Sequence, residues 1–130
     1  MNALSLRQPW AWLVTAGHKD VENRTWTTRH RGEFLIHAAK IFDYAGYERL
    51  LCEIHLVLPA PGEFERGGIV GVAELVDCVT QHDSPWFWGP FGFVLRNARP
   101  LPFHPLRGMP GFFPVAGEWR TGDRTAGRKS

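Results

Sequence analysis

The segment 3–26 constrains the fold most, because it places charges of both signs between large apolar side chains. Pro9 suits the first position of a helix, where its fixed φ fits and its missing N–H donor is not needed. Gly17 can adopt the left-handed backbone conformation that ends a helix. Apolar residues such as Trp10 and Leu13 recur between them at helical spacing. We therefore predict a short helix between Pro9 and Gly17 with one buried face.

The charged residues after this helix favour a polar cleft. If residues 20–26 form a strand, alternate side chains point to one side, and these are Asp20, Glu22, Arg24 and Trp26. An ionised side chain is costly to bury without a partner, so this face suits the wall of a cleft better than a core. The other interpretation is a solvated face on which Glu22 and Arg24 pair with neighbouring charges.

Two further basic residues follow predicted strands and are candidates for ligand binding. Arg7 follows a strand at 3–6 and precedes the helix, where backbone N–H groups attract anions. An ion pair between Arg7 and Glu22 is the other interpretation. Lys40 follows the apolar strand at 34–36, and the small alanines before it leave room for a ligand to approach the backbone.

Two titratable side chains lie on or beside predicted apolar strands. His37 is either a hydrogen-bonded core residue or a catalytic residue. Glu74 interrupts an apolar row of the predicted strand at 68–79. A carboxylate in that position either pairs with a cation or has its pKa raised by desolvation, and both states are useful in a site.

The aromatic segment 84–95 contains turn-forming residues and several large rings. Trp86 and Trp88 can expose a flat ring there, and stacking of a base on such a ring contributes about 1–3 kcal/mol. The other interpretation is that both rings seal the end of the folded domain.

Composition bounds the class of protein. At 130 residues and 14.8 kDa, with 44% hydrophobic residues, the chain suits one domain, which we place at 1–119. We expect residues 120–130 to be a basic, disordered tail. No membrane-spanning run or secretion signal is found, so we expect a cytoplasmic protein without membrane contact. The two cysteines lack metal-ligand spacing, so we expect no metal and no cofactor.

Charge is distributed unevenly along the chain. The formal net charge is only +2, but residues 1–40 carry six Lys or Arg against three Asp or Glu, residues 41–95 two against eight, and residues 96–130 seven against two. If the fold brings the two chain ends together, one face becomes basic and the opposite face acidic. Such polarity is expected of a protein that meets phosphate groups on one side.

Five sequence blocks in order closely resemble the ASCH domain family, and the resemblance covers about 115 of the 130 residues. They are LSLRQPWA at 4–11, GHKDVENRTW at 17–26, RGEFLIHAAK at 31–40, GIVGVAE at 68–74 and WFWGPFGFVL at 86–95. The resemblance implies an α+β fold, a small PUA-like mixed β-barrel with flanking helices. It also implies a cleft associated with RNA or modified nucleosides.

One branch of this family, the N4-acetylcytidine amidohydrolases, uses a lysine, a threonine and a strand glutamate. By resemblance, Lys19 and Glu74 take the first and third positions, whereas Glu22 stands where that branch has its threonine. The proposed hydroxyl nucleophile is therefore missing. Thr25 or Ser5 replaces it only if the fold brings either hydroxyl close to Lys19.

Three functional hypotheses follow. The preferred one is binding of RNA, another single-stranded nucleic acid or a modified nucleoside. In it Lys19, Arg24 and Lys40 contact phosphate or ribose, Glu22 or Glu74 accepts a hydrogen bond from a base, and Trp86 stacks on the base. The second is a small hydrolase, an N4-acylcytidine amidohydrolase or a ribonuclease, with Lys19 as base and Glu74 as proton shuttle. The third is an interaction domain that docks a protein through its aromatic patch.

Overall fold

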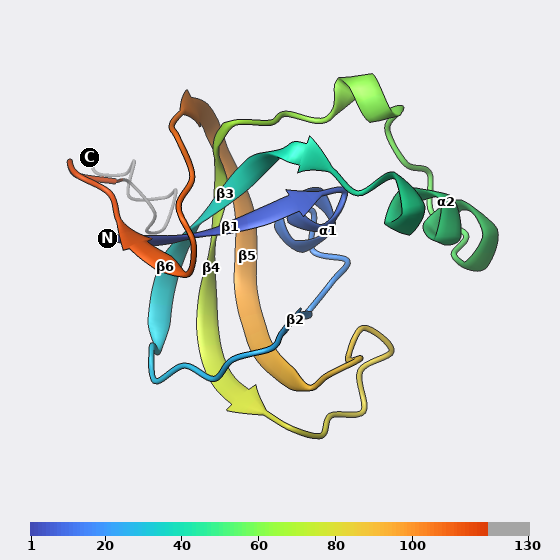
Figure 1. Cartoon of the computed structure of the whole chain (residues 1–130), viewed down its shortest axis with the longest axis horizontal. Coiled ribbons are helices and arrows are strands. Elements are labelled where there is room, and N and C mark those ends of the chain that lie inside the picture. Colours follow the sequence, from blue (N-terminus) through green and yellow to red (C-terminus); the bar gives the residue numbers. More distant parts are fainter. Residues whose placement is uncertain (120–130) are drawn as a thin grey trace.

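A computed structural model of the chain describes residues 1–119 and shows an α+β fold (Figure 1). The strands are β1 (Asn2–Gln8), β2 (Val21–Arg24), β3 (Gly32–Phe42), β4 (Gly68–Val79), β5 (Phe91–Pro105) and β6 (Phe112–Pro114). The helices are α1 (Trp10–Thr15) and α2 (Tyr44–Glu53), with a short 3-10 helix at Pro61–Glu63. The expected tail at 120–130 lies outside the described residues.

All six strands form one mixed sheet in the order β2-β5-β4-β3-β1-β6. β1 and β3 are parallel and the other neighbours are antiparallel. The long strands β3, β4 and β5 bend, so that the sheet curls (Figure 1). The predicted α+β class is therefore confirmed.

The structure does not show the closed barrel that the family resemblance implied. Within residues 1–119 the strand pairings run from β2 to β6 and do not join these two edge strands. Side chains meet across the opening instead: the rings of Trp26, just after β2, and Phe112, in β6, lie 5.9 Å apart between centroids in an edge-to-face arrangement. Both edge strands are short, four residues in β2 and three in β6, and each pairs with a single neighbour.

The main core lies on the inner face of the curled sheet. Phe34 of β3 and Phe93 of β5 are almost fully buried there, and Trp26 and Phe112 pack against the same cluster. A second, smaller cluster on the other face is covered by the segment that follows β5. It contains Ala3, Leu35, Ile69, Val72, Phe113 and Val115.

The predicted helix after Pro9 is confirmed as α1, and it packs against the inner face of the sheet. Ala11 and Val14 of α1 join the main core. Gly17 has a φ of 85° and ends the helix as expected. Asp43 links α1 to α2, because its Oδ1 accepts a hydrogen bond from Gly46 N at the start of α2 and its Oδ2 accepts one from Trp10 Nε1 at 2.8 Å.

Gly71 marks the closest contact between α1 and the sheet. A Cβ atom there would lie 2.4 Å from Thr15 Cγ2 and 2.6 Å from the carbonyl oxygen of Arg99. We predict that Gly71→Ala lowers the free energy of unfolding by roughly 1–3 kcal/mol, because backbone atoms of β5 cannot rotate away. Urea unfolding followed by circular dichroism measures this change. Gly62→Ala is the matched control, since a Cβ at Gly62 meets nothing within 4 Å; equal midpoints for the two variants would contradict the prediction.

Candidate functional site

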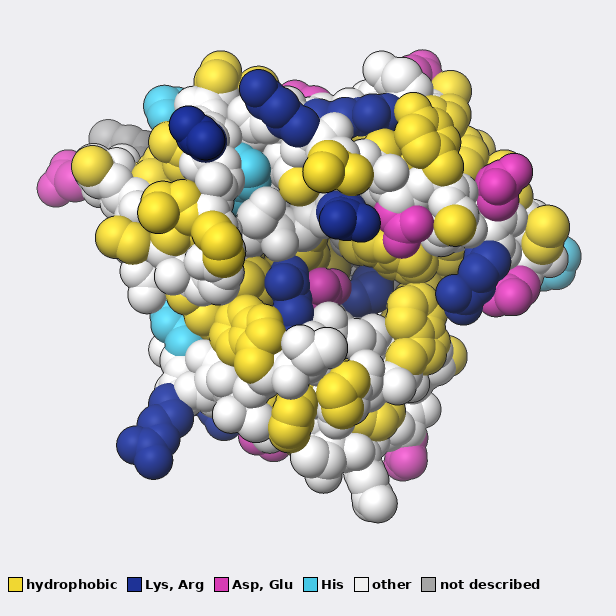
Figure 2. All heavy atoms as spheres, viewed as in Figure 1, with side chains coloured by type: hydrophobic (Ala, Val, Ile, Leu, Met, Phe, Trp, Pro, Cys, Tyr) yellow, Lys and Arg dark blue, Asp and Glu magenta, His cyan; other side chains and the backbone are white. Residues whose placement is uncertain are grey.

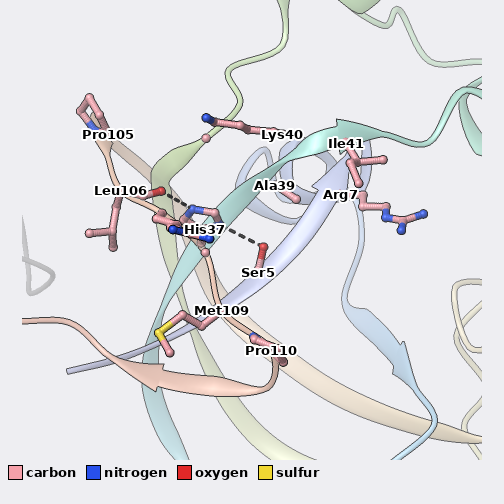
Figure 3. A pocket seen from close by; sticks show the side chains of 13 residues that line it. Ser5, Arg7, His37, Ala39, Lys40, Ile41, Pro105, Leu106, Met109 and Pro110 are labelled. Carbon is pink, nitrogen blue, oxygen red and sulfur yellow. Dashed lines mark hydrogen bonds between the residues drawn. The ribbon is translucent and has the colours of Figure 1, made fainter.

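A cavity of about 810 Å³ lies where β1, β3 and the segment after β5 meet (Figure 3). We call it the basic pocket, because Arg7, Lys40 and Arg107 line it and no Asp or Glu does among the described residues. All three side chains are exposed. Within residues 1–119 none of them forms an ion pair or a side-chain hydrogen bond, so their charges are available to an anionic ligand. The ion pair of Arg7 with Glu22, the other interpretation of Arg7, does not form, because Glu22 pairs with Lys19 and Arg24.

A hydrogen-bonded serine and histidine lie deeper in the basic pocket. Ser5 and His37 are register partners on β1 and β3, and Ser5 Oγ lies 2.9 Å from His37 Nδ1. His37 Nε2 lies 2.6 Å from the carbonyl oxygen of Leu106. His37 is only 2% exposed, as the core interpretation of this residue predicted, yet its ring lines the pocket. Sequence reasoning did not identify Arg107 as a pocket residue, nor the hydrogen bond between Ser5 and His37. In both cases the fold brings together segments that lie far apart in the chain.

Three predicted cleft residues, one just before β2 and two in it, form a charged strip, which we define as Lys19, Glu22 and Arg24. Lys19 is 3% exposed, and its Nζ donates hydrogen bonds to the carbonyl oxygen of Val21 and, at 2.9 Å, to Glu22 Oε1. Glu22 Oε2 lies 3.3 Å from Arg24 Nε. Arg24 Nη2 donates a hydrogen bond of 2.9 Å to the carbonyl oxygen of Ser5. Glu22 therefore compensates both cations, and the strip ends at the backbone of the basic pocket.

A second cavity, of about 370 Å³, lies between α2 and the loop that joins β4 to β5. We call it the tryptophan pocket, because Trp10, Trp86 and Trp88 line it. Trp88 is 50% exposed, and its ring centroid lies 5.5 Å from that of Trp10 and 5.5 Å from the guanidinium carbon of Arg49. Trp88 therefore exposes its ring, as the base-stacking interpretation expects, and is not buried as a ring that seals the end of the domain would be.

Asn23 fixes the loop that carries these rings, a role that the sequence did not indicate. Its side-chain amide donates to the carbonyl oxygen of Trp86, and its side-chain oxygen accepts hydrogen bonds from the backbone N–H groups of Trp88 and Gly89.

Trp10 links the two pockets, since Lys19 Nζ lies 5.8 Å from the centroid of its ring. A continuous series of contacts thus runs from the basic pocket through the charged strip to the tryptophan pocket.

Glu74 lies apart from this series. Its carboxylate accepts hydrogen bonds from Arg96 Nε at 3.0 Å, Arg96 Nη2 at 3.2 Å and Asn97 Nδ2 at 3.1 Å. These bonds, chiefly those from Arg96, lower the pKa of the Glu74 carboxyl, and the same contact raises the pKa of Arg96. Glu74 lines neither pocket. Of the two states expected for this carboxylate, the structure shows pairing with a cation.

Metal-binding clusters and membrane-spanning helices are both absent from residues 1–119. No group of three or more His, Cys, Asp or Glu side chains there is arranged to hold a metal ion. No described helix is both long enough and apolar enough to span a membrane.

Comparison with known proteins identifies a family. The model of the ASCH domain matches residues 4–87. Human activating signal cointegrator 1 is 31% identical over 121 residues, which cover 82% of this chain and 21% of that protein. The mouse protein of the same name is 34% identical over 85 residues, which cover 60% of this chain and 14% of that protein. The chain thus spans about a fifth or less of the length of these relatives.

We predict that the ion pairs of the charged strip stabilise the folded protein. Glu22→Gln removes the only carboxylate that compensates Lys19 and Arg24 among the described residues, so we expect the free energy of unfolding to fall by about 3 kcal/mol. Urea unfolding at pH 7 measures this. Glu74→Gln is the control, because it breaks an ion pair with Arg96 whose side chain is 64% exposed. A loss for Glu22→Gln no larger than that for Glu74→Gln would show that the strip does not stabilise the fold.

Proposed function

Since the chain belongs to the ASCH domain family, which is part of the PUA-like group, we propose that it binds RNA or a modified nucleoside in the basic pocket. The observation that carries this proposal is the set of three exposed cations, Arg7, Lys40 and Arg107, around one cavity without a carboxylate. A phosphate-bearing ligand supplies the negative charge that this pocket lacks. Figure 2 shows Lys and Arg side chains along a hollow on this face of the molecule, with an Asp or Glu side chain among them.

The unpaired cations are suited to phosphate contacts. Lys40 lies in β3, near the end of this strand, and its side-chain carbons lie close to Gly67, where a Cβ atom would be 3.2 Å from Lys40 Cε. Arg7 extends from the end of β1 on the opposite part of the rim (Figure 3). Two long cationic side chains on different strands can contact successive phosphates or a phosphate and a ribose. Such contacts set affinity without reading sequence.

The tryptophan pocket supports a second contact for the same ligand. The exposed face of Trp88 and the neighbouring Trp86 offer surfaces on which a base can stack. The Glu22 carboxylate lies between the two pockets, and a carboxylate oxygen that already accepts one hydrogen bond can accept another from a base amino group. A short single strand therefore fits along the series of contacts, with phosphate at the basic pocket and a base at the tryptophan pocket.

The hydrolase alternative receives less support. It requires Lys19 and Glu74 to act on one substrate, but Lys19 donates to Val21 and Glu22 while Glu74 accepts from Arg96 and Asn97. Neither Lys19 nor Glu74 lines the basic pocket or the tryptophan pocket. The Ser5 hydroxyl, one candidate substitute for the missing threonine, hydrogen-bonds to His37.

We predict saturable binding of a fluorescent single-stranded RNA at low salt, weakened as salt rises because bound cations release counterions from the phosphates. The double variant Arg7→Ala/Lys40→Ala should weaken binding about tenfold or more and reduce the magnitude of the salt slope by about 2. Fluorescence anisotropy over a salt series measures both quantities.

The control is Arg31→Ala/Arg96→Ala, which removes the same charge from side chains that already pair with Asp77 and Glu74. Equal weakening in the two double variants would show that affinity follows net charge and not the basic pocket. Absence of binding at low salt would overturn the RNA proposal. Release of acetate from N4-acetylcytidine, lost in Lys19→Ala and Glu74→Ala, would instead support the hydrolase.

A further inference from the structure

We propose that Ser5 and His37 form a nucleophile and base pair, and that this pair hydrolyses carboxylic esters carried by a phosphate-bearing ligand. The proposal adds an activity at the floor of the basic pocket. The assignment of Ser5 as nucleophile and His37 as base depends only on the geometry of Ser5, His37 and Leu106. The choice of a phosphate-bearing ester rests on the proposed function of the pocket.

The hydrogen bonds around His37 assign its protons. The carbonyl oxygen of Leu106 can only accept, so His37 Nε2, at 2.6 Å, must carry the hydrogen (Figure 3). In the neutral ring, Nδ1 then has a free lone pair and accepts the hydroxyl hydrogen of Ser5 at 2.9 Å. A serine hydroxyl is a weak nucleophile until an adjacent base removes its proton, and this arrangement places the base in contact.

The imidazole ring is also held in a fixed orientation. Its Nε2 is anchored by Leu106, and the ring of Phe113 packs against it at a centroid distance of 5.9 Å and an angle of 77°. The Leu106 carbonyl takes the place that a carboxylate or another acceptor has in related nucleophile and base pairs, because it orients the ring and favours one tautomer. Leu106 is therefore a positioning residue, acting through its backbone.

The pair is open to the pocket because residue 108 has no side chain. A Cβ atom at Gly108 would lie 2.6 Å from His37 Cε1, 3.0 Å from His37 Nδ1 and 3.2 Å from Ser5 Oγ. A larger residue at this position would therefore clash with the His37 ring unless the ring or the segment around residue 108 shifts. Ser5 itself is partly exposed and lines the cavity.

The proposed reaction balances with water as the only co-reactant. Ser5 Oγ attacks the ester carbonyl carbon while its proton moves to His37 Nδ1, and the cations of the pocket offer positive charge to the oxyanion. The C–O bond to the alcohol then breaks, and the alcohol leaves with the proton from Nδ1. Water attacks the acyl-serine, gives a proton to Nδ1 and releases the carboxylic acid, after which that proton returns to Ser5 Oγ.

The first test is covalent labelling, which needs no nucleic acid. The folded protein is treated with a neutral fluorophosphonate, and the modified residue is found by peptide mass spectrometry. We expect one adduct on Ser5, formed at least tenfold faster than on Ser84. Ser84 is the matched control, because it is also partly buried but its hydroxyl donates to Asp20 Oδ1 at 2.6 Å and has no histidine as base.

Two variants test the role of His37. His37→Asn should slow the labelling of Ser5 at least tenfold, since the base is lost. Gly108→Ala should also slow it, because the added methyl group clashes with the His37 ring and displaces the base from Ser5; this variant serves if circular dichroism shows that His37→Asn is unfolded. No adduct on Ser5, equal labelling of Ser5 and Ser84, or unchanged labelling in the folded His37 variant or in Gly108→Ala would overturn the proposal.

The second test concerns the substrate. Hydrolysis of 2′(3′)-O-acetyl-AMP is compared with hydrolysis of 2′(3′)-O-acetyladenosine, a pair that differs only by the phosphate. We expect kcat/KM to be at least tenfold higher for the phosphorylated ester, and Arg7→Ala/Lys40→Ala to remove this preference. Equal rates for the two esters would overturn the assigned substrate class. A failure of labelling with intact RNA binding would reject this activity alone, whereas labelling of Ser5 without RNA binding would reject the proposed function alone.

Discussion

The interaction on which the arrangement of this protein depends is the one that Glu22 makes with Lys19 and Arg24. β1 and β2 lie far apart in the order of the sheet, separated by β3, β4 and β5. Arg24 nevertheless reaches the Ser5 carbonyl oxygen, so the strip crosses the opening of the curled sheet. A lysine as buried as Lys19 requires such compensation, because a charge removed from water is costly without a partner. The hydrogen bond from Arg24 thus links β2 to β1, and the contact of Trp26 with Phe112 links the end of β2 to β6, although no strand pairing joins β2 to either strand within residues 1–119.

The same strip separates two kinds of cation. Lys19 and Arg24 are tied to Glu22 and to backbone oxygens, and they serve the fold. Arg7 in β1 and Lys40 in β3 lie outside the strip, and neither forms an ion pair or a side-chain hydrogen bond among residues 1–119. Because paired charges gain little from a further anion and free charges gain more, affinity for phosphate is expected to concentrate on one side of the strip. The Lys and Arg side chains of the strip thus stabilise the fold, whereas those of the basic pocket are available to a ligand.

Local signals in the sequence predicted much of this structure. The helix between Pro9 and Gly17 and the strand at 68–79 follow from backbone preferences and from spacing, and both are observed. The family was also identified correctly from its blocks. The partners of Glu74 could not be predicted, because Arg96 and Asn97 reach it only through the register of β4 and β5. Closure of the sheet likewise depends on the reach of the short edge strands, which no local pattern encodes.

Candidate site residues divided in the same way. Arg7 and Lys40 were predicted as ligand-binding residues that follow strands; in the structure they lie within β1 and β3, near the strand ends, and line the basic pocket. Ser5 and His37 were each visible as single residues, but their hydrogen bond requires the parallel pairing of β1 with β3.

Asp43 has a consequence for the mobility of the second pocket. One of its carboxylate oxygens accepts a hydrogen bond from the first turn of α2, and the other accepts one from the indole N–H of Trp10. A single side chain therefore sets the spacing between two walls of the tryptophan pocket. A swing of the helix away from the sheet would have to break one of these bonds or carry the indole with it. Opening of this cavity and displacement of the Trp10 ring next to Lys19 are therefore coupled motions. A ligand that moves α2 away from the sheet would also move the ring that contacts the charged strip.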